Sequence, residues 1–367
     1  MEAASQFDLL GPDAPAAAPP PAPITERQGR WVPDRVVFTP DAIALPFGQQ
    51  IRARVAALGL PSEVLRGNRI VGLRGKGERE TYRIAKRTLS VVTAPAGQVA
   101  LQPIPPSADW QFHLAQGCPA HCQYCYLAGS LAGPPTIRVH ANLPQILANL
   151  PRYVRPGALT TFEASCYTDP LALEHLTGSL AETIRHFGEP AMEGAQLCWV
   201  SKFDSVEPLL GLDHRGRTRA RFSVNAEPIA RRFEGGTASV AARLGAARSM
   251  AQAGYPIGLV VAPIMPVAGW QVEYGRLLDE ARAVLPAACD LTLELITHRF
   301  TPGSKETLRT WYPASALEMD EAARSTKRGK FGAPKYVYGS ETMGELRRWF
   351  MAALAARFPK ARVSYWT

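Results

Sequence analysis

The chain has 367 residues, of which 46% are hydrophobic and 20% are charged, and its formal net charge at pH 7 is +9. This length and composition allow a sizeable core in one large domain or two smaller ones and exclude a chain that is disordered throughout. No apolar run approaches the roughly 18 residues of a membrane helix, and the N-terminus lacks the basic-then-apolar order of a secretory signal. We therefore expect a cytoplasmic protein without a membrane partner. The positive charge favours a polyanionic partner such as nucleic acid.

Residues 1–30 contain an Ala/Pro-rich tract at 14–23, which cannot bury side chains and predicts a disordered tail. A transit peptide is the alternative, but acidic residues precede the first arginine, Arg27, which argues against it. A small N-terminal α/β region follows at 31–106, with helical periodicity at 49–58. A basic stretch in this region is either a solvated helical face or an element that grips DNA. It consists of Arg74, Lys76, Arg79, Arg83, Lys86 and Arg87.

From residue 107 to 300, apolar strand-like runs alternate with helix-length segments such as 239–253 and 271–285. Six strand-helix units predict an α/β fold with a parallel sheet, a partial (β/α)6 TIM-like barrel. A closed barrel has eight units, so the site of a partial barrel is expected at the carboxyl ends of its strands, where the loops converge. The six expected strands are 110–114, 160–166, 196–201, 221–226, 257–264 and 291–297.

The alternation stops near residue 300, and residues 301–367 are expected to form a C-terminal extension with a helix at 341–357. Before that helix, basic and aromatic residues are interleaved around Gly329 and Gly332. This composition predicts a hairpin that could contact a nucleic-acid backbone and stack on bases, although an exposed hairpin without a ligand is equally compatible with it. The residues that would contact DNA are Lys330, Phe331, Lys335, Tyr336 and Tyr338.

Three of the six cysteines, Cys118, Cys122 and Cys125, crowd into a loop directly after the first expected strand. Three thiolates leave one iron of a 4Fe-4S cubane open to an exogenous ligand. The amino and carboxylate groups of S-adenosylmethionine can chelate that iron, which predicts a radical enzyme that cleaves this cofactor to a 5'-deoxyadenosyl radical. The alternative is a zinc site that adds His121, but no second Cys/His pair follows at the usual spacing. Tyr126, directly after the last cysteine, could pack against the adenine.

An ordered series of motifs beyond this loop resembles the spore photoproduct lyase family, DNA repair enzymes of the radical S-adenosylmethionine (radical SAM) superfamily. The resemblance extends over nearly the whole chain after the tail. The motifs that carry it are 117–127, Ile137-Arg138-Val139, Phe162-Glu163-Ala164 with Cys166, His175-Leu176-Thr177, 222–225, 258–264, Phe300 after His298-Arg299, and 335–338.

The resemblance implies that the radical opens a methylene-bridged thymine dimer and restores two thymines without light. It also implies that Cys166 donates hydrogen to the thymine allylic radical and that Tyr124 relays the hydrogen atom back to deoxyadenosine. Without the resemblance, a lone cysteine in an apolar strand is a small buried hydrophobe, and Cys198 and Cys289 keep that interpretation.

Further roles follow from the same resemblance. Besides Tyr126, the residues expected to contact the cofactor are Thr168, Lys202, Ser223, Asn225 and Ala262. Ser223 and Asn225 are placed there because alternate residues of a strand share one face. The family presents an arginine-tyrosine pair to the lesion, whereas this chain has Lys330 and Phe331, which leaves the lesion preference open.

The expected partners are DNA that contains a thymine photolesion and an external one-electron reductant of the flavodoxin or ferredoxin type, and the expected oligomeric state is a monomer. Two other functions remain open. One is a radical SAM enzyme that acts on another nucleic-acid or nucleoside substrate. The other is a non-catalytic, zinc-stabilised DNA-binding module.

Overall fold

The computed structural model describes residues 30–98, 100–130, 133–164, 166–328 and 334–367. Within these residues the largest element is an eight-stranded sheet with the order β17-β14-β13-β11-β10-β9-β5-β4. All neighbouring strands from β17 to β5 are parallel, and β4 pairs with β5 in the antiparallel direction. The strands are β4 Gln102–Ile104, β5 Ala108–Phe112, β9 Thr160–Ala164, β10 Ala195–Ser201, β11 Thr218–Val224, β13 Ile257–Ile264, β14 Leu291–Thr297 and β17 Arg362–Trp366.

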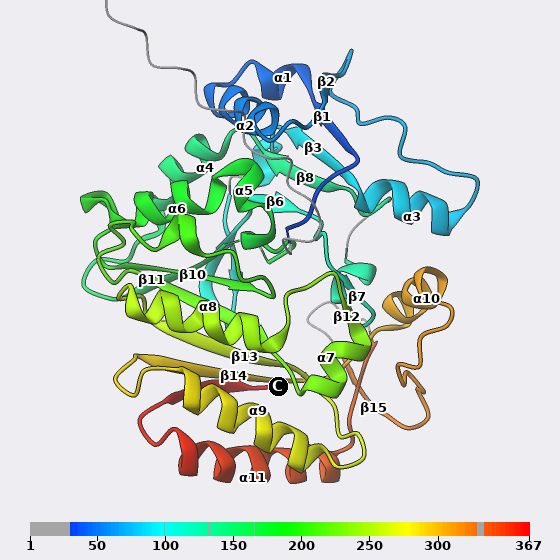
Figure 1. Cartoon of the computed structure of the whole chain (residues 1–367), viewed down its shortest axis with the longest axis vertical. Helices are drawn as coiled ribbons and strands as arrows, with labels where there is room; N and C mark the ends of the chain where they lie inside the picture. The colour runs from blue at the N-terminus through cyan, green and yellow to red at the C-terminus, as the bar shows by residue number, and fades with distance from the viewer. Residues whose placement is uncertain (1–29, 99, 131–132, 165, 329–333) are drawn as a thin grey trace, which may run out of the picture.

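The sheet is curled into a half-barrel, and helices cover its outer face (Figure 1). All seven residues of β11 are buried, as expected for a parallel strand that is covered on both faces. The covering helices include α6 Ser179–Gly188, α8 Val240–Gln252, α9 Trp270–Val284 and α11 Ser340–Arg357. The predicted α/β partial barrel is therefore confirmed.

The six expected strands correspond to β5, β9, β10, β11, β13 and β14, with shifted ends. In particular, β5 begins two residues before the expected start at 110, and β11 begins three residues before the expected start at 221. Two further strands join the sheet, β4 at one edge and β17 at the other. Strand β17 comes from the C-terminal extension, so residues beyond 300 complete the half-barrel.

The N-terminal region forms a second sheet of five strands, in the order β2-β1-β3-β8-β6. Two of these strands, β8 and β6, come from beyond residue 106, so the expected boundary at that residue does not separate two sheets. The division of the chain into domains otherwise stays a prediction. The strands are β1 Arg35–Phe38, β2 Ser62–Val64, β3 Thr88–Val92, β6 Ala115–Gln116 and β8 Ile137–His140, and the helices are α1 Pro40–Ile43, α2 Pro46–Ala57 and α3 Glu78–Lys86.

Shorter elements surround the open end of the half-barrel. The two-residue strands β7 His121–Cys122 and β12 Glu234–Gly235 pair with each other, and α10 Pro302–Trp311 packs against α3. The hairpin is formed by β15 Ser325–Arg328 and β16 Pro334–Val337. Its tip, with Lys330 and Phe331, lies outside the described residues. The remaining helices are α4 Leu143–Asn149, α5 Glu174–Thr177 and α7 Glu227–Phe233.

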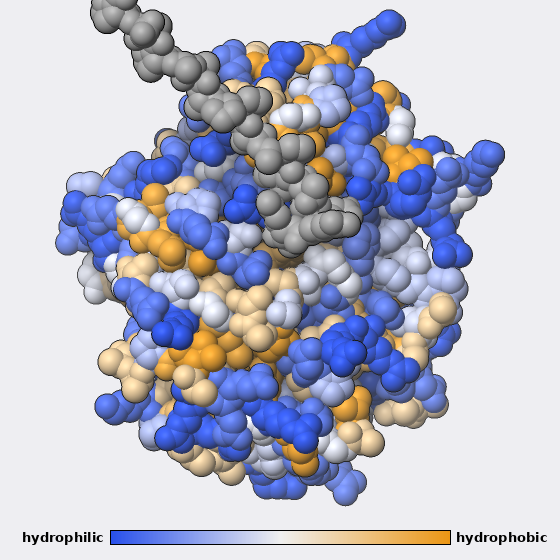
Figure 2. Space-filling model, viewed as in Figure 1, coloured by the Kyte–Doolittle hydropathy of each residue, from blue (hydrophilic) through white to orange (hydrophobic). Residues whose placement is uncertain are grey.

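Figure 2 shows a surface on which hydrophilic residues predominate and hydrophobic residues form smaller groups between them. Within the described ranges, no helix combines the length and the apolar character that crossing a membrane requires.

Candidate active site

A cavity of about 490 Å³ lies at the carboxyl ends of the half-barrel strands. It brings together most of the residues that the sequence analysis selected, although they come from segments far apart in the chain. These residues are Cys118, Cys122, Tyr124, Cys125, Tyr126, Cys166, Thr168, Lys202, Ser223 and Ala262.

The cysteine loop begins at Gly117, whose φ of 82° lies in the left-handed region that favours glycine. A Cβ atom at this position would lie 2.4 Å from the backbone carbonyl oxygen of Thr136, so only glycine fits here. Further along the loop, the buried Lys86 of α3 donates hydrogen bonds to the carbonyl oxygens of Cys118 and Ala120. The N-terminal region therefore fixes the shape of the loop through one lysine.

Glu234 lies beside the cysteine loop because it is the partner of Cys122 in the β7–β12 pair. Its buried carboxylate forms ion pairs with Lys202 at 2.9 Å and Arg243 at 2.6 Å, and it accepts a hydrogen bond from the hydroxyl of Tyr124. Burial alone would raise the pKa of Glu234, but the two cations outweigh it and hold the pKa at about 2. The carboxylate is thus ionised and fixes the positions of Lys202 and Tyr124.

The three cysteines fit an iron-sulfur cluster by the chemistry of their donor set. All three thiols line one cavity, and soft thiolates are the ligands that such clusters take. Burial raises the pKa of each thiol, so thiolates here require a cationic partner such as iron. Among the described residues, no group of three or more His, Cys, Asp or Glu side chains could hold a single metal ion. A cubane has a different requirement, because each thiolate binds a different iron.

Cys166 lies just after β9 and faces the same cavity. Burial raises the pKa of its thiol, and the nearby carboxylate of Glu163 raises it further, so the sulfur keeps its proton at neutral pH. The hydroxyl of Tyr126 donates a hydrogen bond to the carbonyl oxygen of Cys166, whereas the hydroxyl of Tyr124 is bonded to Glu234. Tyr126 is therefore the loop tyrosine that contacts Cys166.

A buried charge network lies on the cavity wall next to Cys166. Arg221 of β11 is 2% exposed and contacts Glu163 of β9 and Glu294 of β14, each at 2.8 Å. The hydroxyl of Tyr365, on β17, donates to the other oxygen of Glu294 at 2.8 Å. Gly258 gives the arginine its space, because a Cβ there would lie 2.6 Å from Cγ of Arg221. The network therefore ties four strands of the half-barrel together.

Replacing Arg221 with methionine should lower the free energy of unfolding by about 3–5 kcal/mol at pH 8, because two carboxylates are then left buried without their cation. Urea unfolding at pH 8 measures this.

The matched control for this change is Arg276→Met, which removes an arginine–glutamate pair on the exposed face of α9. Exposed pairs contribute less than about 1 kcal/mol, so this variant should unfold close to the parent. Equal losses in the two variants would contradict the role of the network.

The remaining cofactor residues occupy different places. The hydroxyl of Thr168 donates to the carbonyl oxygen of Gly117, and Nζ of Lys202 lies 3.3 Å from the carbonyl oxygen of Ala262. Asn225 is not brought into this cavity. It lies just after β11 ends at Val224, and its amide nitrogen donates to the carbonyl oxygen of Pro263 at 2.9 Å.

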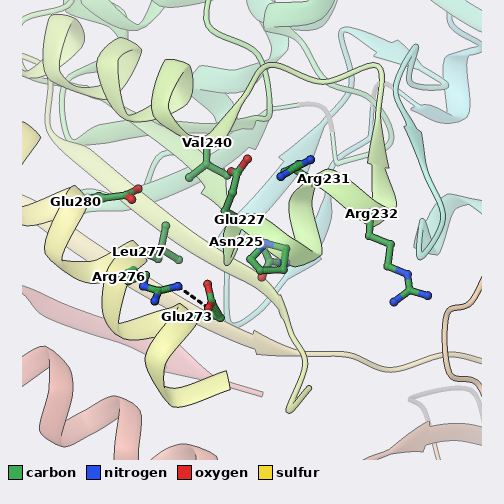
Figure 3. A pocket seen from close by; sticks show the side chains of 10 residues that line it. Asn225, Glu227, Arg231, Arg232, Val240, Glu273, Arg276, Leu277 and Glu280 are labelled. Atoms are coloured by element: carbon green, nitrogen blue, oxygen red, sulfur yellow. Dashed lines mark hydrogen bonds and ion pairs between the residues drawn. The ribbon is translucent and has the colours of Figure 1, made fainter. Parts of the chain in front are cut away.

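Asn225 instead lines a separate cavity between α7 and α9 (Figure 3). The other side chains of that cavity include three glutamates and three arginines, and the pair Arg276–Glu273 lies 2.7 Å apart. The described hairpin residues Lys335, Tyr336 and Tyr338 also lie outside the cysteine cavity. Tyr336 stacks near Phe300 with ring centroids 5.2 Å apart, and Tyr338 lies under the guanidinium of Arg324. Lys335 is half-buried on β16.

Sequence reasoning did not select several residues of the site. Lys86 belongs to the basic stretch, but nothing in its spacing distinguishes this buried lysine from the less buried residues of the stretch. Glu234 and Arg221 belong to no motif, and only long-range packing gives them their partners. Asp169 was also missed, although its carboxylate accepts hydrogen bonds from Ser201 and from the backbone of Lys202, at 2.7 and 2.8 Å.

A curled parallel half-barrel with a loop of three cysteines at the carboxyl ends of its strands defines the radical SAM class of protein. The comparisons with known proteins agree with this class. A family model described as "Spore photoproduct lyase" matches residues 31–367. The chain belongs to the spore photoproduct lyase family, which consists of radical SAM lyases.

Curated relatives match over almost their full length. The spore photoproduct lyase of Geobacillus sp. (strain Y412MC61) is 40% identical over 342 residues, which cover 92% of this chain and 99% of the relative. That of Bacillus subtilis (strain 168) is 36% identical over 345 residues, which cover 93% of this chain and all of the relative.

Solved structures of spore photoproduct lyase have the same fold. One is complexed with dinucleoside spore photoproduct, and a mutant form has both AdoMet, which is S-adenosylmethionine, and dinucleoside spore photoproduct bound. Each is 38% identical to this chain and superposes with a TM-score of 0.86, over 92% of this chain and 99% of the solved one.

Proposed function

We propose that this chain repairs spore photoproduct, a methylene-bridged thymine dimer in DNA, by a radical reaction that restores two thymines without light. The observation that carries the proposal is the shared cavity of about 490 Å³. It places the three-cysteine loop and the protonated thiol of Cys166 in one enclosure at the open end of the half-barrel. Relatives solved with AdoMet and the dinucleoside lesion support the same assignment of cofactor and substrate.

We assign Cys118, Cys122 and Cys125 as the ligands of a 4Fe-4S cluster with one iron left for S-adenosylmethionine. Bound together, the cluster and S-adenosylmethionine supply the deoxyadenosyl radical that removes hydrogen from the lesion. The chain's own residues position the cofactor. Lys202 is held by Glu234 beside the loop, and the buried Ser223 and the backbone of Ala262 line the same wall.

Cys166 supplies a hydrogen atom to the thymine radical that remains after the methylene bridge breaks, and the thiyl radical left on its sulfur takes a hydrogen atom from 5'-deoxyadenosine. This role requires an S–H group, and burial together with the charge of Glu163 keeps the thiol protonated. Tyr126 holds the backbone at this position through its hydrogen bond to the carbonyl oxygen. The hydroxyl of Tyr124 donates its hydrogen bond to Glu234 and not to Cys166. The relay role of Tyr124 therefore stays a prediction.

A lesion inside a duplex cannot reach an enclosed radical, so the dimer must be turned out of the base stack, and a damaged pair makes this less costly. The hairpin is connected to the edge of the cavity. Tyr336 of β16 pairs with Phe300, and Phe300 directly follows His298 and Arg299, which line the cavity. Through this link we assign the hairpin to DNA contact. A monomer in the cytoplasm, supplied with electrons by a flavodoxin or ferredoxin, fits this reaction.

Anaerobic reaction of the reconstituted, reduced protein with S-adenosylmethionine and dinucleoside spore photoproduct tests the proposal. We expect thymine residues to be restored and 5'-deoxyadenosine to form or be recycled. Cofactor cleavage without repair of any thymine dimer would instead indicate a radical SAM enzyme with another nucleoside substrate. A colourless protein that contains zinc and no iron would indicate a DNA-binding module without catalysis.

A further inference from the structure

Another large cavity, of about 730 Å³, lies in the N-terminal region, away from the cysteine site. It is enclosed between the loop that precedes α3 and the carboxyl ends of the parallel strands β3 and β8. Ligands of parallel α/β sheets bind at this edge of the sheet. The lining side chains that matter here are Arg69, Arg74, Thr93, Gln116 and Arg138.

The register of the sheet shows which way the strand residues point. Val91 and Val139 belong to the hydrophobic core, so the alternate residues on β3 and β8 face the opposite side. Arg138 lies on this opposite face, next to Ser90 on one side and Gln116 of β6 on the other. The Arg138 side chain therefore points away from the core, toward the loop that covers this face.

The cavity is positively charged, and its charge is not neutralised. Three arginines line it, and among the described residues of its lining none is aspartate or glutamate. Arg69 and Arg74 are exposed on the covering loop, where hydrophilic residues predominate around α3 (Figure 2). In this respect it differs from the cavity between α7 and α9, where arginines and glutamates are equal in number.

Two buried polar atoms of the lining have no hydrogen-bond partner in the described part of the chain, Nε of Arg138 and Oγ1 of Thr93. Leaving a buried donor unpaired is destabilising, and native proteins keep few such groups. Burial also lowers the pKa of Arg138, because no counter-charge compensates its desolvation. Both atoms can donate to an oxyanion, which the described lining does not itself supply.

We propose that this cavity binds a phosphate group, and that this group is a backbone phosphate of the lesion-bearing DNA strand. The second part rests on the proposed repair function. Gln116, which pairs with Arg138, is two residues before Cys118, and two residues span at most about 7 Å. A phosphate held here would therefore anchor the DNA strand beside the cluster loop. Phosphate contacts of this kind set the position of a protein on DNA without reading the base sequence.

Substitutions in the cavity test the proposal against a matched control on the same loop. The variants are Arg138→Gln and, because Arg138 is partly buried, the exposed pair Arg69→Gln with Arg74→Gln. The control is Arg66→Gln, which removes the same charge from an exposed position outside the lining. Binding of a lesion-bearing oligonucleotide is followed by fluorescence anisotropy over a range of salt concentrations.

We expect the cavity variants to bind the oligonucleotide about tenfold more weakly, since a hydrogen bond to a charged group is lost. The slope of log affinity against log salt should fall by about 1 for the one phosphate contact. The control should keep the parental slope. Repair of the dinucleoside lesion, which has no flanking backbone phosphate, should be unchanged in every variant.

Two results would overturn the proposal. One is an equal loss of affinity in Arg66→Gln and the cavity variants, which would indicate diffuse charge. The other is stabilisation by inorganic phosphate that the cavity variants abolish while oligonucleotide binding is unaffected, which would assign the cavity to a free phosphorylated molecule. If the proposed repair function is wrong, the results differ from both of these. No dimer would be repaired, but the slope of log affinity against log salt would still depend on Arg69, Arg74 and Arg138.

Discussion

Replacing Cys122 with alanine is expected to abolish assembly of the iron-sulfur cluster and to reduce cleavage of S-adenosylmethionine to background. Two thiolates would remain for a cubane that already takes one ligand fewer than the usual four. Cys122 is buried and lies opposite Glu234, so no other cysteine can replace it from solvent. Iron and acid-labile sulfide analysis after anaerobic reconstitution, together with the yield of 5'-deoxyadenosine, measures the effect.

The control for this change is Cys289→Ala. Cys289 is a free cysteine that is partly buried between α9 and β14 and does not line the cysteine cavity. This variant should retain the parental content of iron and sulfide. A Cys122→Ala protein with an intact cluster would show that the metal is bound elsewhere and would remove the basis of the proposed reaction.

Replacing Cys166 with alanine should have the opposite profile: the cofactor is still cleaved and the lesion still loses its hydrogen, but clean repair fails. The thymine radical then lacks its hydrogen donor and is expected to react with other species, which gives abnormal thymine adducts. Chromatography of the products, with 5'-deoxyadenosine measured in the same reaction, separates this outcome from a loss of radical formation.

Cys198→Ala is the matched control, because this thiol is near the same charged residues, Glu163 and Arg221, but does not line the cavity. It is buried on β10, and its sulfur donates to the carbonyl oxygen of Phe162 at 3.3 Å. Its products should be the same as those of the parent. If Cys166→Ala also leaves the product distribution unchanged, Cys166 has no part in the reaction.

The order of strands and helices in the half-barrel was predictable because each element has a local pattern of apolar residues. Helices α8, α9 and α11 lie within one or two residues of the expected ranges. The two edge strands were not predicted, because their short sequences acquire a role only through pairing with β5 and β14. Strands β6 and β8 were missed for the same reason.

Asn225 shows where a local argument ends. Two-residue alternation placed it with Ser223 on one face, but β11 ends at Val224, and beyond that residue the pleat no longer sets the direction of a side chain. The amide of Asn225 is bonded instead to Pro263 and to the hydroxyl of Tyr274. The proposed lesion contacts of Lys330 and Phe331 stay predictions, since both residues lie outside the described ranges.

By itself, the sequence determined the candidate cluster ligands, because Cys118, Cys122 and Cys125 lie within eight residues and their spacing alone predicts a three-thiolate loop. Only the tertiary structure decided what surrounds them. Lys86, Glu234 and Arg221 come from an N-terminal helix, a two-residue strand and the middle of the large sheet. Their buried charges are tolerated because folding brings each one to a partner distant in the chain. No local sequence pattern predicts such a long-range contact.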